Sequence, residues 1–202
     1  MNIAIYGGTF DPPHIGHINA CKNLIGKLNI DKLYVIPTFI PPHKQRTSDV
    51  SAEIRYEMCK IAFADISDKI EISDVEMKRQ GKSYTADTIR FFKEKGNELI
   101  YFLCGTDMLL TLGTWYNPEY IFANAEIVCM RREEDPSILL EIEKKVQFYK
   151  ERFNAKVHFL YAEPIKLSSS EIRSIEVRDQ IRPYVSEKVF EFICEKGLYG
   201  KV

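Results

Sequence analysis

The sequence has no apolar run long enough to cross a membrane and no excess of either charge. Its 202 residues carry a formal net charge of -1, so the charge balance gives no reason to expect a nucleic-acid partner. A membrane-spanning helix needs about 20 consecutive apolar residues. The chain also begins directly with a strand-like pattern, without the charged leader and apolar segment of a secretory signal. We therefore expect a cytoplasmic protein with no membrane and no nucleic-acid partner.

The sequence also has no paired cysteines, repeats or linkers. The cysteines are odd in number and scattered, and no Cys-x-x-Cys motif occurs, so neither disulfides nor a zinc site are expected. Buried thiols in a reducing compartment are the favoured interpretation. The length suits one substantial core, and we expect a single domain over residues 1–202. The cysteines are Cys21, Cys59, Cys104, Cys129 and Cys194.

Short apolar runs alternate with segments of helical spacing along the chain. The pattern predicts strands over residues 3–6, 32–36, 69–75, 99–104, 126–130 and 156–161, and irregular loops over 38–46 and 78–83. Helices are expected over residues 18–28, from a cap at Ser51 to residue 64, and from a cap at Thr85 to residue 96. Two further helices should end at residue 123 and at about residue 153. Another should begin at Ser168, and the last should run from a cap at Ser186 to residue 197. This alternation predicts an α/β fold with a parallel sheet, which binds ligands beyond its strand ends where the strand order reverses.

Residues 7–17, Gly-Gly-Thr-Phe-Asp-Pro-Pro-His-Ile-Gly-His, follow directly on the first expected strand. Gly7 and Gly8 allow the backbone to approach a ligand closely. His14 and His17 lie three residues apart on one face of the first helical turn, so both rings can face one anion. Main-chain N–H groups at a helix start lack partners within the helix and attract anions. The stretch predicts a phosphate site; the alternative is a tight turn with two surface histidines.

This stretch resembles the signature of the nucleotidyltransferase superfamily with the His-x-Gly-His motif. Residues 41–44, 83–88, 105–107 followed by Trp115, and 167–173 add a resemblance to its nicotinate-nucleotide adenylyltransferase branch. Residues 7–17 and 167–173 match motifs that the whole superfamily shares. The three segments between them indicate the branch. The resemblance covers nearly the whole chain. It implies a Rossmann-like, doubly wound parallel sheet in a single nucleotidyltransferase domain, with a C-terminal helical segment from about residue 168 packed on it.

The resemblance implies adenylyl transfer from ATP to the phosphate of nicotinate mononucleotide, with Mg²⁺ accompanying ATP. The nucleophile is an anionic phosphate oxygen, so no general base is needed, and the site must position and stabilise anions instead. We expect His17 to act at the α-phosphate, His14 at the phosphates beside it, and Arg173 at the β- and γ-phosphates. No cluster of carboxylates argues for a metal site made by the protein.

The other candidate residues divide between ATP and the acceptor. Asp107 ends a buried strand at a glycine, where its carboxylate can accept hydrogen bonds from a ribose or cap the next helix. The resemblance puts Thr85, Trp115 and Tyr116 around the pyridine ring, and Asp11 is expected to be structural. Expected ATP contacts are Gly7, Gly8, Thr9, Phe10, Gly16, Gly105, Asp107, Ser168, Ser169 and Ser170, and expected acceptor contacts are Lys44, Thr85, Trp115 and Tyr116.

Several alternatives stay open at this point. The same chemistry can use nicotinamide mononucleotide, phosphopantetheine or a phosphorylated alcohol as acceptor, although residues 41–44 and 83–85 argue against the last two. A non-catalytic nucleotide sensor is a second possibility, and a homo-oligomer is a third open point. The branch often has one arginine and a Pro-Gly type turn where residues 131–134 read Arg-Arg-Glu-Glu, which leaves an adenine contact in this loop open.

Overall fold

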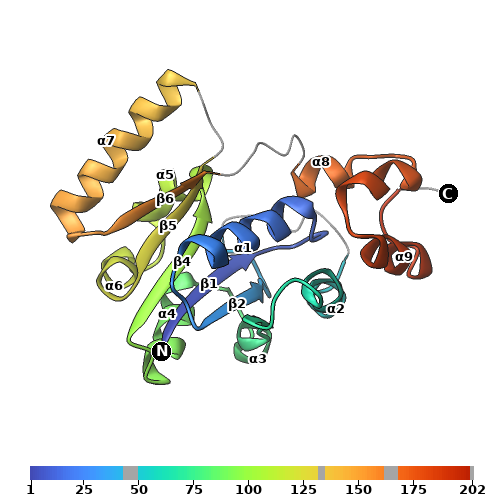
Figure 1. Cartoon of the computed structure of the whole chain (residues 1–202), viewed down its shortest axis with the longest axis horizontal. Helices are drawn as coiled ribbons and strands as arrows, with labels where there is room; N and C mark the ends of the chain where they lie inside the picture. The colour runs from blue at the N-terminus through green and yellow to red at the C-terminus, as the bar shows by residue number, and fades with distance from the viewer. Residues whose placement is uncertain (43–49, 132–134, 162–167, 201–202) are drawn as a thin grey trace.

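Parallel strands form the centre of the fold (Figure 1). The computed structural model describes residues 1–42, 50–131, 135–161 and 168–200. Within these residues the strands are β1 (Asn2–Gly8), β2 (Lys32–Pro37), β3 (Ile70–Ile72), β4 (Leu99–Gly105), β5 (Glu126–Arg131) and β6 (Val157–Tyr161). They lie in the order β3-β2-β1-β4-β5-β6, all parallel, so the order reverses between β1 and β4. This arrangement confirms the predicted doubly wound parallel sheet.

Helices cover both faces of this sheet. They are α1 (Ile15–Lys27), α2 (Ala52–Phe63), α3 (Val75–Arg79), α4 (Thr85–Glu94), α5 (Thr106–Thr111), α6 (Pro118–Asn124), α7 (Pro136–Phe153), α8 (Ser169–Arg173) and α9 (Glu187–Glu195), with 3-10 turns η1 (Leu112–Thr114) and η2 (Arg178–Tyr184). Side chains alternate along each strand. Ala4 of β1 therefore packs with α1 and α2, whereas Ile3 and Ile5 pack with α3 to α7.

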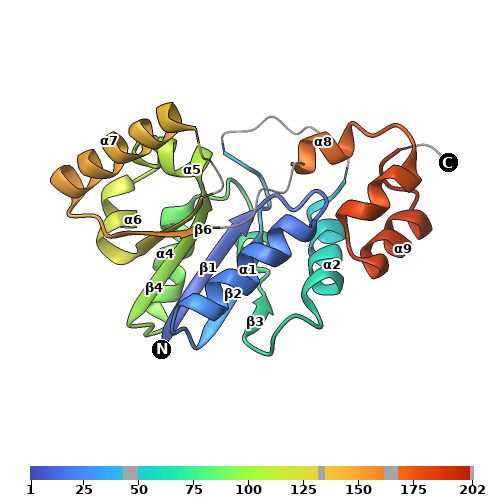
Figure 2. The same cartoon turned by 45° about the horizontal axis from the view of Figure 1, so that its top comes forward.

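The core on the α1 face continues into the C-terminal helices. Ile172 of α8, Ile181 of η2 and Ile193 of α9 are buried in the same apolar cluster as α1 and α2. Figure 2 shows α9 beside α2, and the two helices are in contact. Residues 168–200 therefore pack through these side chains on the same core as the sheet.

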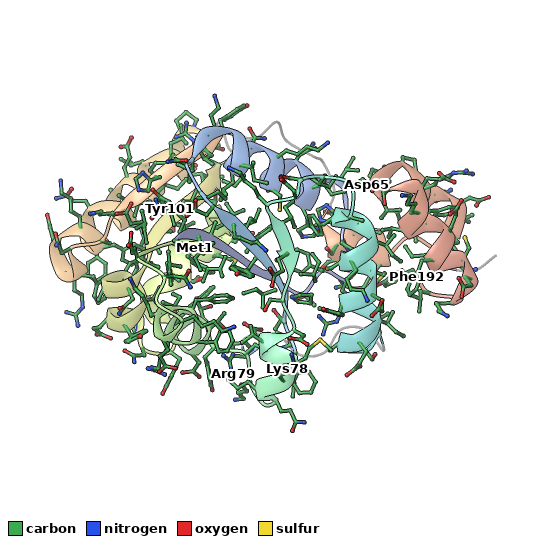
Figure 3. The ribbon with its side chains drawn as sticks, turned by 60° about the horizontal axis from the view of Figure 1, so that its bottom comes forward. Met1, Asp65, Lys78, Arg79, Tyr101 and Phe192 are labelled. Carbon is green, nitrogen blue, oxygen red and sulfur yellow. The ribbon has the colours of Figure 1, made fainter. Side chains whose placement is uncertain are left out.

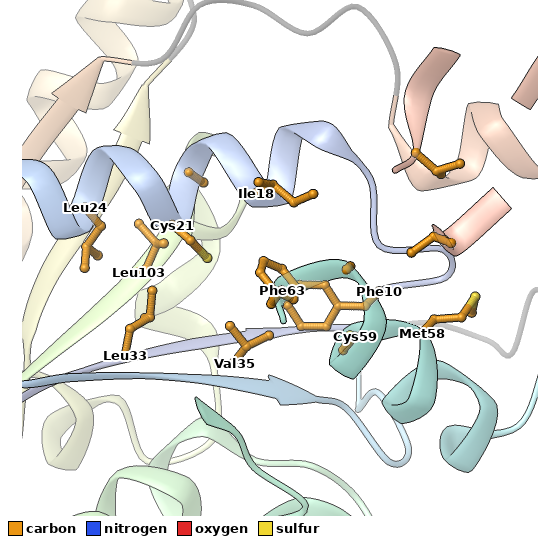
Figure 4. Packing of buried hydrophobic residues seen from close by; sticks show 14 of the residues in the cluster. Phe10, Ile18, Cys21, Leu24, Leu33, Val35, Met58, Cys59, Phe63 and Leu103 are labelled. Atoms are coloured by element: carbon orange, nitrogen blue, oxygen red, sulfur yellow. The ribbon is translucent and has the colours of Figure 1, made fainter. Parts of the chain in front are cut away.

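Phe10 anchors the loop after β1 in this cluster. Figure 4 shows its ring beneath α1, close to Phe63 and Cys59 of α2. Only 1% of Phe10 is exposed, and its backbone has a positive φ of 49°. The left-handed conformation disfavours a bulky side chain, so burial of the ring offsets a local backbone cost and fixes the course of the loop.

Most of the predicted helix starts are confirmed by capping contacts. The hydroxyl oxygens of Ser51 and Ser186 accept hydrogen bonds from main-chain N–H groups in the first turns of α2 and α9. Ser168 and Glu171 form a reciprocal capping box at the start of α8. The five cysteines are free thiols, four of them buried, as their scattered positions predict. Among the described helices, none has the length and apolar character that crossing a membrane requires.

Several predicted boundaries are wrong. The strand expected over 69–75 is shortened to β3, and α3 takes up Lys78 and Arg79, which were expected in a loop. The polar sequence hides this helix because its stabilising contact is tertiary: the hydroxyl of Thr88 donates to the buried Glu76 carboxylate. Thr85 is the first residue of α4 and Tyr84 occupies the cap position, without a side-chain cap bond.

The remaining differences concern one helix end and three short elements. The last helix ends at Glu195, two residues early, because Gly197 adopts a φ of 63° that ends the helical geometry. The short elements α5, η1 and η2 were not predicted. Each has seven residues or fewer, which is too short for helical periodicity to be recognised in a sequence.

Candidate active site

The candidate site lies where the strand order reverses. β1 and β4 are neighbouring parallel strands, with Ile5 paired to Phe102, and their carboxyl ends lead into the loops at Gly8 and Gly105. A parallel sheet binds ligands at this position. A Cβ atom built on Gly7 or Gly105 would meet nothing within 4 Å among the described residues. No described atom therefore crowds the main chain at these two strand ends.

Gly8 also has a packing role that the sequence did not predict. A Cβ atom at Gly8 would lie 3.1 Å from the Phe10 ring, so the glycine makes room for this anchor. The Phe10 ring packs on Tyr6, His17 and Phe63, with centroid distances of 5.4, 4.8 and 6.2 Å. The Phe10 ring is therefore buried in the core and does not face a ligand.

His14 and His17 share one hydrogen-bonded arrangement at the start of α1. The main-chain N–H of Gly16 donates to Nδ1 of His14, and that of His14 donates to Nδ1 of His17, both at 3.1 Å. The ring centroids are 3.8 Å apart. Because each Nδ1 is an acceptor, a neutral ring carries its proton on Nε2. The arrangement provides two adjacent Nε2–H donors, and the N–H of Gly16 is already engaged.

Burial, reinforced by the neighbouring His14, holds the pKa of His17 well below its usual range. His17 is therefore neutral near pH 7 in the absence of a ligand. Such a ring acts as a hydrogen-bond donor whose direction is set by the backbone. A neutral imidazole is not a general acid near pH 7, and an ionised phosphate has no proton for a general base to remove.

The start of α8 lies against this loop, as Figures 1 and 2 show. The hydroxyl of Ser169 donates to the carbonyl oxygen of Pro12 at 3.1 Å. Arg173 donates from Nη1 to the carbonyl oxygen of Asp11 at 2.7 Å and from Nη2 to the hydroxyl of Ser170 at 3.1 Å. The structure thus brings together the first loop and the serine segment, which are about 160 residues apart in sequence.

Ser168 and Asp107, two further expected ATP contacts, take no part in these hydrogen bonds between the first loop and α8. The Ser168 hydroxyl is engaged with Glu171 in the capping box at 2.7 Å, so its expected contact with ATP competes with a structural role. Asp107 is exposed in the first turn of α5, and Gly105 occupies the cap position. The alternative that Asp107 caps the helix is therefore wrong, and Asp107 lies two residues after the end of β4.

Thr85 and Trp115, two of the expected acceptor contacts, lie near one small cavity at β1. Gly7 and Thr85 line one cavity of about 20 Å³, enough for a single water molecule. Trp115 packs on Phe102 of the same cavity, with ring centroids 6.2 Å apart. Lys44 lies outside the described residues. The cavity is lined by Ile5, Gly7, Ile36, Glu76, Thr85, Thr88 and Phe102.

Tyr116 completes this aromatic group. Its ring lies on that of Tyr84, with centroids 4.5 Å apart, directly before Thr85 in sequence. Tyr116 is 52% exposed, which leaves its outer face open to a planar ligand. A larger surface cavity of about 310 Å³ lies elsewhere, between α2 and β3, and contains none of the expected site residues.

Arg55 is a functional candidate that the sequence interpretation missed. This α2 residue is 4% exposed and donates from Nη1 to the carbonyl oxygen of Thr9 at 2.6 Å. Its Nη2 donates to the carbonyl oxygens of Thr38, at 2.6 Å, and Phe39, at 3.4 Å. Arg55 thus ties the first loop to the loop after β2. The sequence signal for its burial is its position four residues before Cys59, which puts both side chains on the same face of the helix.

Glu76 is a second missed residue. Its Oε1 accepts from the hydroxyl of Thr88 at 2.8 Å, and Arg79, labelled in Figure 3, donates to the same hydroxyl at 3.2 Å. Burial raises the pKa of Glu76. Its Oε2 has no hydrogen-bond partner among the described residues. The nearby loop carries Ser83. Its main-chain N–H donates to the carbonyl oxygen of Ile40, and its hydroxyl accepts from the main-chain N–H of Phe39.

The described residues contain no cluster of side chains that could coordinate a metal ion. No group of three or more His, Cys, Asp or Glu side chains among them is arranged to hold an ion. A divalent cation at this site would have to be held largely by phosphate oxygens and water, which suits the coordination that Mg²⁺ prefers.

Comparison with known proteins shows which family the chain belongs to. Residues 5–175 match the family described as cytidylyltransferase-like. Probable nicotinate-nucleotide adenylyltransferases from Clostridium tetani and Caldicellulosiruptor saccharolyticus are 36% and 35% identical, over 97% and 98% of this chain and 98% and 99% of the relatives. The Plasmodium falciparum nicotinic acid mononucleotide adenylyltransferase complexed with NaAD has a TM-score of 0.76 at 24% identity, over 98% of this chain and 97% of that one, which supports the fold. The chain therefore belongs to the cytidylyltransferase-like nucleotidyltransferases, in the nicotinate-nucleotide adenylyltransferase family of its full-length relatives.

Proposed function

We propose that the protein transfers the adenylyl group of ATP to the phosphate of nicotinate mononucleotide, giving nicotinate adenine dinucleotide and pyrophosphate. Membership of the family and the names of the full-length relatives support this reaction. The observation that carries it is the contact between two donor-rich helix starts, made by the Ser169–Pro12 and Arg173–Asp11 hydrogen bonds. One polyphosphate can bridge two such segments.

In the proposed reaction, a phosphate oxygen of the mononucleotide attacks the α-phosphorus of ATP. The bond from this phosphorus to the oxygen that bridges to the β-phosphate breaks, and pyrophosphate leaves with the electron pair. The attacking oxygen is already ionised, so no side chain has to remove a proton. The site lowers the barrier by holding the two anions together and by stabilising charge on the transferred group.

We assign the donors by their positions. His17 donates through Nε2–H to the α-phosphate, and His14 donates to the phosphates beside it. Arg173, Ser169 and Ser170 receive the leaving pyrophosphate. Donors already oriented by hydrogen bonds need no reorganisation when charge develops, and the Nδ1 contacts of both histidines provide this orientation. Mg²⁺, bound with ATP, would be held by phosphate oxygens and water and would offset part of the phosphate charge.

The acceptor side is assigned to the aromatic group. Trp115 and Tyr116 stack around the pyridine ring, and Thr85 with neighbouring main-chain N–H groups binds the nicotinate carboxylate. Lys44 contacts the acceptor phosphate or ATP, and Asp107 accepts hydrogen bonds from a ribose. The free thiols of the chain suit the reducing cytoplasm that we propose as its location.

The test is a comparison of acceptors. Pyrophosphate release is followed with Mg-ATP and, separately, nicotinate mononucleotide, nicotinamide mononucleotide and phosphopantetheine. We expect kcat/KM to be highest for the nicotinate mononucleotide. A preference for the amide would retain the chemistry and overturn the assignment of the acid, and a preference for phosphopantetheine would overturn the acceptor class. Binding of ATP without turnover for any acceptor would favour a sensor.

A further inference from the structure

Asp11 is a buried carboxylate at the centre of the contact between the first loop and α8. Only 3% of the residue is exposed. Its main-chain oxygen accepts the 2.7 Å hydrogen bond from Arg173, whose Nη1 lies 3.7 Å from the carboxylate oxygen Oδ2. The hydroxyl of Tyr199 donates to the other carboxylate oxygen, Oδ1. Two residues from the C-terminal region thus approach Asp11 on different oxygens.

The tail that carries Tyr199 is fixed in place by Arg178. The guanidinium of Arg178 donates from Nε to the carbonyl oxygens of Leu198, at 3.1 Å, and Tyr199, at 3.0 Å, and from Nη2 to that of Gly200, at 3.2 Å. A Cβ atom on Gly200, which has a φ of 57°, would lie 3.0 Å from the main-chain nitrogen of Arg178. The close approach therefore requires glycine, and the tail has one defined position.

Arg173 and Tyr199 approach Asp11 on different oxygens, and the Arg173 guanidinium forms no bidentate pair with this carboxylate. Arginine and a carboxylate strongly favour a bidentate pair, with two parallel N–H···O bonds. Here Arg173 binds the main-chain oxygen and remains 3.7 Å from Oδ2. Its other terminal nitrogen lies at the Ser170 hydroxyl. A guanidinium drawn into a bidentate pair with Asp11 would turn away from Ser170 and from the phosphates assigned to that position.

We infer that Tyr199 is a positioning residue for Arg173: by donating to Oδ1 of Asp11, its hydroxyl holds the carboxylate in the orientation that leaves the guanidinium directed at Ser170 and the leaving pyrophosphate. This inference rests on the proposed function through the role of Arg173 at the ATP phosphates. It adds a residue near the end of the chain that touches neither substrate. The effect of Tyr199 on ATP should therefore depend on the presence of Arg173.

The test is a double-mutant cycle of Tyr199→Phe and Arg173→Ala, read by calorimetric binding of Mg-ATP and by kcat/KM for ATP. We expect Tyr199→Phe to weaken both by about tenfold, which lies within the range of coupling between residues of one hydrogen-bond network. In the Arg173→Ala background the same change should cost less than about twofold. The KM for the mononucleotide should stay unchanged.

The matched control is Tyr184→Phe. Tyr184 packs against the same core cluster, and its hydroxyl makes no hydrogen bond within the part of the chain that the structure describes; its removal should leave ATP binding unchanged. Equal losses from Tyr199→Phe in both backgrounds, or equal losses for both substrates, would overturn the inference. If Tyr199→Phe does not fold, Arg178→Gln loosens the tail and must give the same ATP-specific, Arg173-dependent loss.

The binding measurement separates this inference from the proposed function. It needs no acceptor, so it can be read even if nicotinate mononucleotide is not used. Lack of turnover with that acceptor would contradict the proposed function alone. Turnover together with an additive cycle would contradict the role of Tyr199 alone.

Discussion

Replacing Arg55 by methionine should destabilise the protein strongly, because this side chain joins two loops of the site from a buried position. Methionine keeps a similar length and an apolar body, but it loses the donors to Thr9, Thr38 and Phe39. The carbonyl oxygens of these three partly buried residues would lose their charged donor. Both the fold and the geometry of the first loop therefore depend on this guanidinium.

The magnitude follows from the two 2.6 Å hydrogen bonds. Hydrogen bonds from a charged donor contribute about 1.5 to 3 kcal/mol each, which gives about 3 to 6 kcal/mol for the two. Removing a buried charge recovers part of its desolvation cost, so we expect a net loss of about 3 kcal/mol in the free energy of unfolding. For a domain of this size, 1 kcal/mol shifts Tm by about 2 to 4 °C, so Tm should fall by about 6 to 12 °C.

Urea unfolding followed by circular dichroism measures this loss. Trp115 is the only tryptophan, and its fluorescence gives a second probe for the two-state test. Arg152→Met on the exposed face of α7 is the control and should change stability by less than about 0.5 kcal/mol. A loss below about 1 kcal/mol for Arg55→Met would refute the claim that Arg55 holds the loops together.

Two further predictions concern protonation and transition-state contacts. His17→Ala should lower kcat by about ten- to a thousandfold, the range for one oriented donor, while weakening ATP binding far less; equal losses in rate and affinity would make His17 an ordinary binding residue. Glu76→Gln should gain in Tm relative to the wild type as pH rises from 4.5 to 8. The pKa of Glu76 is raised by burial, so stability from its neutral form is present below the ordinary pKa and is lost as pH rises through the folded value. A Tm difference that does not change with pH would contradict this.

The sequence predicts the parts of the fold that depend on local patterns. The apolar run at residues 99–104 indicated a buried central strand, and β4 occupies the middle of the sheet. Ser51, Ser168 and Ser186 indicated helix starts because a hydroxyl oxygen can accept from the next turn. The opposition of the first loop and the serine helix was also expected, because motif resemblance supplied a pairing that spacing alone cannot give.

The missed features depend on contacts between distant residues. Arg55 binds carbonyl oxygens up to 46 residues away, and carbonyl groups leave no mark in a sequence. Helix α3 looks like a polar loop because its support comes from Thr88 on another helix. Phe10 has the position of a phosphate-loop residue, yet its ring is a core anchor, since the positive φ at this residue turns it inward.

The most direct test of the account is the identity and ratio of the products. The protein is incubated with Mg-ATP and nicotinate mononucleotide, and the nucleotides are separated and identified by mass. The account predicts nicotinate adenine dinucleotide and pyrophosphate in equal amounts, with no ADP. ADP and inorganic phosphate, or consumption of ATP without a dinucleotide, would contradict attack at the α-phosphorus and with it the roles given to His17 and Arg173.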